Sequence, residues 1–204
     1  IILTNIVCLL PILAGVLLYN RLPEQIVTHW DAAGNPNGWS SRFTGAIVFP
    51  GILFLVNLAF PILLKIDPKY NNISDKIKTL LYWIIPAVAL FASTSTLAEA
   101  LGYNTRVQFT TPLFIGLIFT IIGNYLPKMS QTYTVGIKLP WTLADEDNWD
   151  RTHRFAGRLW VVCGILIMIT TFLHVKPVSI IILAVVMVAA PTIFSLKLFL
   201  QKNK

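Results

Sequence analysis

Apolar residues run along the chain in six long stretches, separated by shorter polar segments rich in Gly, Pro and Asn. Each stretch is about 20 residues long, which as an α-helix covers the ~30 Å hydrocarbon core of a bilayer. Lipid offers no hydrogen-bond partners to backbone groups, so stretches this long and uniformly apolar are predicted to be helices and not barrel strands. The predicted spans cover approximately residues 1–19, 44–64, 80–101, 107–126, 155–173 and 178–200.

Five of the six stretches contain an internal proline, which removes one helical hydrogen bond and commonly kinks the helix. Membrane helices tolerate such kinks. The sequence therefore predicts an all-α, polytopic membrane protein with six kinked transmembrane helices, in which residues 1–204 form a single integral membrane domain.

Composition supports this class of fold. Of the 204 residues, 55% are hydrophobic and 12% are charged, against about 25% charged in soluble domains. The mean hydropathy is +0.70. Cys8 and Cys163 both lie inside apolar stretches, where cysteine acts as a small packing residue. We expect no redox role for them and no cofactor.

The basic residues predict the orientation. With a cytoplasmic N-terminus, twelve of the 16 Lys and Arg residues fall on the inner side of the membrane, which is a firm positive-inside signal. Both termini are therefore predicted to be cytoplasmic. Topology and attraction to anionic membrane lipid account for the net charge of +7, so no nucleic-acid partner is expected.

The first long polar segment is the predicted outer loop, residues 20–43. Turn-forming residues gather between Gly34 and Gly38, so the loop is expected to fold back tightly on itself. Trp30 and Trp39 would suit the level of the lipid headgroups.

The second long polar segment covers residues 127–154 and is predicted to hold an inner loop and an interfacial helix. Thr142 and Asp145 have the spacing of a capping box, so a helix is expected to begin there. Trp149 and His153 share one face at helical spacing. The pattern indicates an amphipathic helix on the membrane surface, before the fifth span and continuing into it.

These two loops carry a family resemblance. The outer pattern is Leu22-Pro23-x-x-Ile26-x-x-His29-Trp30-x-x-x-Gly34. The inner pattern has three runs: Gly123-Asn124-Tyr125-Leu126-Pro127-Lys128, Gly136-Ile137-Lys138-Leu139-Pro140-Trp141-Thr142-Leu143, and Trp149-x-x-Thr152-His153-Arg154-x-x-Gly157-x-Leu159-Trp160. Together they resemble the immunity proteins of the sporulation-delaying-protein toxin system. The chain departs from this family at Lys138 and Leu139, where an arginine and a threonine are usual.

The resemblance implies a multi-pass protein of the bacterial cytoplasmic membrane that protects a cell from a secreted, membrane-active peptide toxin. It also implies signalling, by holding a cytoplasmic transcriptional repressor at the membrane. We expect the inner motif to sense toxin occupancy or to dock the partner. The alternative is that it only locks the helical bundle from below. Its candidate residues are Asn124, Pro127, Lys128, Gly136, Lys138, Pro140, Trp141, Thr142, Trp149, Thr152, His153, Arg154 and Gly157.

The outer loop and the outer ends of the helices are the candidate surface for recognising the toxin. Its residues are His29, Trp30, Asp31, Gly34, Glu99 and His174. Two imidazoles and two carboxylates also suit a transition metal, which makes His29, Asp31, Glu99 and His174 candidate metal ligands. The alternative is that Glu99 and His174 simply lie at the membrane interface.

The chain carries no hydrolase, nucleotide-binding or zinc-protease motif, so no enzymatic activity is expected. Two other functions stay open. One is a small transporter or channel, although the middle of the spans offers little polar character beyond Asn57. The other is a membrane metalloenzyme that uses the outer His and carboxylate residues.

Overall fold

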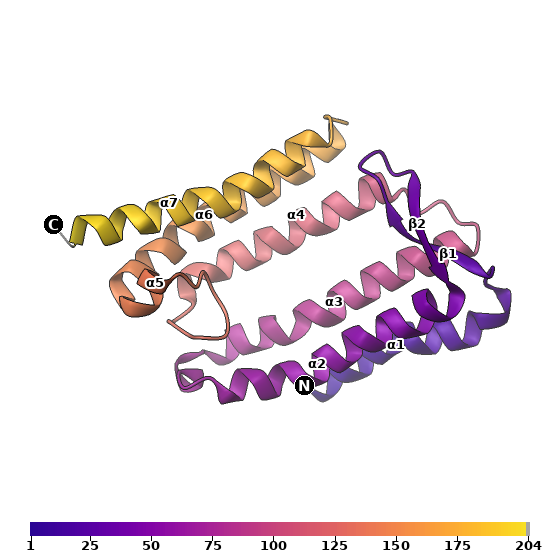
Figure 1. Ribbon diagram of the computed structural model, residues 1–204, viewed down its shortest axis with the longest axis horizontal. Helices are drawn as coiled ribbons and strands as arrows, with labels where there is room; N and C mark the ends of the chain where they lie inside the picture. Colours follow the sequence, from indigo (N-terminus) through magenta and orange to yellow (C-terminus); the bar gives the residue numbers. More distant parts are fainter. Residues whose placement is uncertain (203–204) are drawn as a thin grey trace. The chain divides into compact units, whose positions relative to one another are not determined.

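A computed structural model describes residues 1–202, so Lys204, one of the basic residues assigned to the inner side, lies outside the described residues. Six helices are long and apolar enough to cross a membrane, which confirms the all-α polytopic fold (Figure 1). They are α1 (Ile2–Leu18), α2 (Phe49–Ile66), α3 (Asp75–Ala100), α4 (Val107–Tyr125), α6 (Glu146–Phe172) and α7 (Val178–Lys202). The cytoplasmic position of the termini stays a prediction.

The chain divides into two compact units. The first unit comprises Ile1–Lys65 and Lys78–Gln108, and the second comprises Ile66–Ile77 and the chain from Phe109 onward. The turn between α2 and α3 thus belongs to the same unit as the C-terminal half. The single integral membrane domain stays a prediction.

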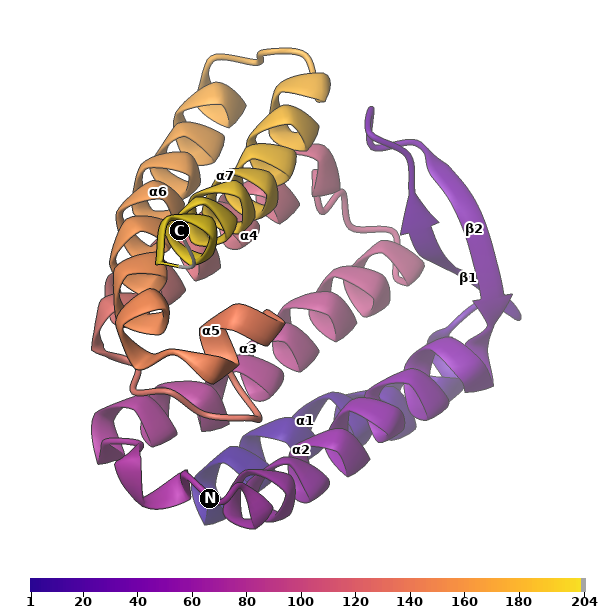
Figure 2. The same cartoon turned by 60° about the vertical axis from the view of Figure 1, so that its left-hand side comes forward.

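In the first unit, α1, α2 and α3 run side by side (Figures 1 and 2). The 3-10 turn η1 (Tyr19–Arg21) leads from α1 into strands β1 (Gln25–Trp30) and β2 (Pro36–Ser41), which form an antiparallel hairpin. A π-helical turn, η2 (Thr44–Val48), then leads into α2. The hairpin confirms the predicted folding back of the outer loop.

A small apolar core anchors this hairpin to its helices. The buried residues Leu22, Ile26, Ala46 and Leu97 pack together, joining the start of the hairpin to η2 and α3. Ile26 is 1% exposed. Ile26 is therefore the side chain of β1 that joins the hairpin to this core.

In the second unit, α4 packs on α6 through glycines. A Cβ atom at Gly123 would lie 2.9 Å from the carbonyl oxygen of Gly157, and one at Gly164 would lie 2.6 Å from that of Gly116. Small residues allow membrane helices to approach at backbone distance. Helix α7 lies along α6 (Figure 2). There the Trp160 indole N–H donates to the Met187 carbonyl oxygen over 2.9 Å.

The predicted capping box is wrong in detail. Asp145 is the N-cap of α6, and its carboxylate accepts from the Asp147 backbone N–H. Thr142 lies in a separate short helix, α5 (Pro140–Ala144), because Pro140 begins a helical turn of its own. The Thr142 hydroxyl accepts from the Leu139 backbone N–H over 2.8 Å. The surface helix and the fifth span are one continuous helix, α6, whose interfacial location stays a prediction.

Candidate functional site

The inner candidate residues gather around two stacked rings at the start of α6. Trp149 and His153 are 0% and 1% exposed, with ring centroids 4.0 Å apart. The Trp149 indole N–H donates to the Met129 carbonyl oxygen over 2.9 Å. This pair holds one end of the inner loop against the helix.

His153 uses both ring nitrogens. Its Nε2 accepts from the backbone N–H of Ile137 at 3.0 Å, and its Nδ1 lies 2.8 Å from the Trp149 carbonyl oxygen. Because a backbone N–H only donates and a carbonyl only accepts, Nδ1 carries the proton and the ring is neutral. Protonation of Nε2 would remove the acceptor for Ile137.

The Trp149 and His153 rings leave no room for a side chain at position 136, which is a glycine. Its φ of +124° lies in a region that side chains disfavour. A Cβ atom there would stand 2.5 Å from the Trp149 ring and 2.8 Å from the His153 Nε2. Only glycine lets the loop close over the stacked pair.

Asp67, which the sequence reasoning missed, anchors the middle of the inner loop. It is 6% exposed, and one carboxylate oxygen accepts from the backbone N–H groups of Tyr133 and Thr134, at 2.9 and 2.7 Å. The Thr134 hydroxyl donates to the same oxygen over 2.6 Å, and the Lys69 N–H donates to the other. Burial opposes ionisation of Asp67, but these hydrogen bonds outweigh it and lower the pKa of the carboxyl group.

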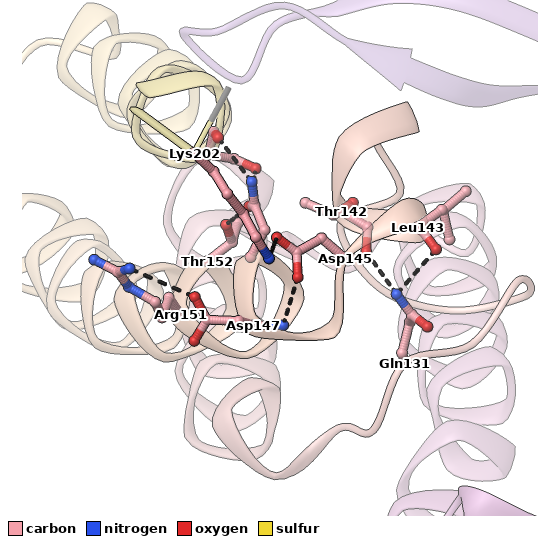
Figure 3. A network of polar contacts seen from close by, with 10 residues as sticks. Gln131, Thr142, Leu143, Asp145, Asp147, Arg151, Thr152 and Lys202 are labelled. Atoms are coloured by element: carbon pink, nitrogen blue, oxygen red, sulfur yellow. Dashed lines mark hydrogen bonds and ion pairs between the residues drawn. The ribbon is translucent and has the colours of Figure 1, made fainter. Parts of the chain in front are cut away.

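Gln131 was also missed, and it ties α5 to the loop. Its amide N–H group donates to the carbonyl oxygens of Thr142 and Leu143, at 2.7 and 3.1 Å (Figure 3). Its side-chain oxygen accepts from the Lys69 ammonium. Gln131 is buried, so each of these bonds replaces water that the side chain has lost.

A buried polar cluster joins α5 and α6 to α7 around Ser195. The Ser195 hydroxyl donates to the Asn148 side-chain oxygen over 2.7 Å and accepts from the Trp141 indole N–H at 2.8 Å. The Asn148 amide N–H donates back to the Ser195 carbonyl oxygen. Thr152 donates to the same Asn148 oxygen over 3.0 Å. The candidates Trp141 and Thr152 thus both bond within this cluster.

Ion pairs surround this buried cluster. Lys202 pairs with Asp145 at 2.9 Å, and Arg151 pairs with Asp147 at 3.5 Å (Figure 3). The hydrogen bond from Lys202 lowers the pKa of the Asp145 carboxyl group. Such exposed pairs contribute only about 0–1 kcal/mol each.

The remaining inner candidates are mostly exposed. Pro127 packs on Gly157, where an added Cβ atom would stand 2.6 Å from the proline ring. The Lys128 ammonium lies 5.0 Å from the centre of the Tyr125 ring, and the Lys138 ammonium donates to the Tyr133 carbonyl oxygen over 3.2 Å. The inner side chains that present themselves to solvent are those of Asn124, Pro127, Lys128, Lys138, Pro140 and Arg154.

In the outer hairpin the candidate residues bond mostly to neighbouring residues of the same turn. Asp31 accepts from the backbone N–H groups of Asn35 and Ala33 at 2.9 and 2.8 Å, and these bonds, that of Asn35 first, lower the pKa of its carboxyl group. His29 bonds to the Asn37 side-chain oxygen. Gly34 turns the chain with a φ of +85°.

Of the other outer candidates, Glu99 has a hydrogen-bond partner nearby in the chain. Glu99 accepts from the Thr105 hydroxyl over 2.7 Å, just beyond the end of α3. His174 follows α6 and is exposed, with a φ of +52°. Among residues 1–202 no group of three or more His, Cys, Asp or Glu side chains is placed to hold a metal ion. Trp30 is half-buried at the end of β1.

Comparison with known proteins matches both halves of the chain. Residues 128–195 match the SdpI/YfhL protein family, and residues 6–54 match a domain of unknown function (DUF1648). The chain is 29% identical over 189 residues to "Immunity protein SdpI" of Bacillus subtilis (strain 168), which covers 90% of this chain and 86% of that protein. No solved structure matches the present chain. The resemblance read from the two loops is therefore confirmed, by the match of residues 128–195 to the SdpI/YfhL family and by the similarity to Immunity protein SdpI.

Proposed function

We propose that this protein is an immunity protein that protects a bacterial cell from a secreted, membrane-active peptide toxin. The observation that carries this proposal is the similarity to Immunity protein SdpI along 90% of the chain. The similar region includes the hairpin and the inner loop. Packing of the apolar spans against one another does not require either of these segments. The protein acts in this proposal by binding, without catalysis.

The proposed toxin-binding element is the hairpin. Three candidate spans, α2, α3 and α4, separate it from the inner loop along the chain, which supports a location of the two on opposite sides of the membrane. The charge distribution favours the outer side for the hairpin. Trp39 is 56% exposed and Phe43 is 55% exposed, which supports contact with an amphipathic peptide at headgroup level.

The proposed partner surface is the exposed part of the inner loop, before α6 begins. Lys128 and Lys138 project from a loop whose backbone is fixed by Asp67, Gln131 and His153. A rigid loop with exposed cations suits an acidic surface of a cytoplasmic repressor. Lys138 replaces the arginine usual in the family, so this contact relies on charge and not on a bidentate fork.

Expression of the chain in a toxin-sensitive strain tests the proposal. We expect the wild type to raise the peptide concentration that halves growth. A Trp39→Ala variant should lose protection while it accumulates normally in the membrane. Failure of the wild type to protect against any secreted membrane-active peptide of its producer, at normal membrane levels, would contradict the proposal.

Signalling is tested separately. A fluorescent fusion of the candidate repressor should move to the membrane when toxin is added. Lys128→Ala with Lys138→Ala should abolish this movement and leave growth protection unchanged. If the repressor moves normally with both lysines removed, they do not form its docking surface.

A further inference from the structure

The exposed side of α6 changes character along its length. Its first half presents charged side chains, ending with Arg151, Arg154 and Arg158. Beyond Arg158, the exposed positions are all apolar until the helix ends. They are Val162, Ile165, Leu166, Ile169 and Phe172.

Within the part of the chain that the structure describes, two of the three arginines lack a carboxylate partner. Arg151 pairs with Asp147 at 3.5 Å, one helical turn earlier. Within the described residues 1–202, Arg154 and Arg158 form no ion pair, although Asp150 stands one turn before Arg154. Two exposed guanidinium groups one turn apart are thus free to bind an anion.

Depth in the membrane indicates which anion. From Arg158 to Phe172 the helix rises about 21 Å, at 1.5 Å per residue. That is shorter than the ~30 Å hydrocarbon core that a spanning helix must cross. The Arg158 backbone therefore lies below the headgroups, and its side chain must extend outward to the phosphate level. Arg154 lies about 6 Å further along the helix, at the headgroups themselves.

An apolar surface adjoins the two arginines. Phe155 lies next to Arg154 on the exposed side of α6 and is 36% exposed. Its ring stacks on that of Phe194 in α7, with centroids 4.6 Å apart. A bound amphiphile would therefore find cations at one level and aromatic and aliphatic side chains immediately below.

We propose that Arg154 and Arg158 bind the phosphate of an anionic glycerophospholipid, with its acyl chains along the apolar side of α6. The planar guanidinium fork matches the phosphate oxygens. A net negative headgroup fits because the site holds two positive charges, whereas a zwitterionic headgroup brings a cation that they repel. The ligand belongs to the bilayer itself, and the site is independent of toxin or repressor.

Lipid retention by the purified protein tests the site. The full chain is titrated in detergent with phosphatidylglycerol or phosphatidylcholine, and lipid adducts are counted by native mass spectrometry. We expect phosphatidylglycerol to be preferred, and Arg154→Gln with Arg158→Gln to weaken its binding about 10- to 30-fold. The matched control, Arg151→Gln, removes one charge from the same helix and should change binding less than about twofold because Asp147 already neutralises it.

A second variant tests whether binding depends on the planar, bidentate geometry of the guanidinium groups or only on their positive charge. Arg154→Lys with Arg158→Lys keeps both cations and should fall between the wild type and the glutamine variant. Equal retention of the two lipids by the wild type would overturn the proposal. So would a loss in Arg151→Gln as large as that in the double variant, because attraction would then be general to the basic surface.

Discussion

The outer hairpin and the inner loop are both long polar connections, yet contacts of opposite range hold them. In the hairpin, Asp31 bonds to Asn35 and His29 to Asn37, within eight residues along the chain. In the inner loop, Asp67 reaches Thr134 across 67 positions, and Gln131 reaches α5 across 11. The polar contacts of the hairpin are thus local, whereas those of the inner loop reach distant parts of the chain.

This difference separates two tasks. Exposed hairpin side chains can change with little effect on the fold, as suits a surface that recognises a variable ligand. The backbone of the inner loop has little such freedom, because Asp67 and Gln131, which hold it, are buried and hydrogen-bonded. Mutations of the two segments should therefore differ in what they damage.

The largest difference is expected between two tryptophans. Trp149→Ala removes a fully buried ring and leaves the Met129 carbonyl oxygen without its donor, which should lower the free energy of unfolding by about 3–5 kcal/mol. Trp39→Ala, at a ring 56% exposed, should cost less than about 1 kcal/mol. Denaturant unfolding in detergent micelles measures both. Equal losses would show that the hairpin is as integral to the fold as the loop.

Two glycines give the next comparison. Gly136→Ala forces a side chain onto the Trp149 ring at a positive φ, and we expect a loss of about 2–4 kcal/mol. Gly51→Ala in α2 meets no atom within 4 Å and should be neutral or stabilising by up to about 1 kcal/mol. Denaturant unfolding in detergent micelles measures both variants. A harmless Gly136→Ala would mean that the loop does not close over the rings.

Two aspartates extend the comparison to pH. Asp67→Asn should cost about 1–3 kcal/mol at neutral pH, because backbone N–H donors lose a charged acceptor. The pKa of folded Asp67 is lowered from the unfolded value of about 3.9, so its stabilisation is present above that value and is lost as pH falls toward the folded pKa.

The difference in unfolding free energy between wild type and Asp67→Asn should thus be constant from about pH 5 to 8 and shrink below about pH 4. Asp31→Asn is the matched control. Its carboxyl group also has a lowered pKa, but it accepts hydrogen bonds only within its own exposed turn. The substitution should therefore change the free energy of unfolding much less. If the difference in unfolding free energy between wild type and Asp67→Asn grew as the pH fell, the role given to Asp67 would be contradicted.

The two regions also show what the sequence can predict. The six spans follow from helical length and hydrophobicity, and the hairpin follows from turn residues, since both signals are local. The contacts of Asp67 and Gln131 could not be predicted, because their partners lie far along the chain. The sequence also does not show whether a polar loop residue is solvated or buried. The motif containing Trp149, His153 and Gly136 was found through the family resemblance, whereas its geometry required the structure.

The smallest effect on stability is expected at His29, where function and folding should separate most clearly. His29 is exposed and bonds to the side chain of Asn37, so His29→Ala should change the free energy of unfolding by no more than about 0.5 kcal/mol. Its place beside Trp30 in the proposed toxin-binding hairpin predicts weaker growth protection at unchanged membrane levels. Thr28→Ala, at the adjacent exposed position of β1, is the matched control and should keep protection. Because neither substitution disturbs the fold, a loss of protection in His29→Ala alone would assign recognition to the imidazole, and equal protection in both would remove His29 from the binding surface.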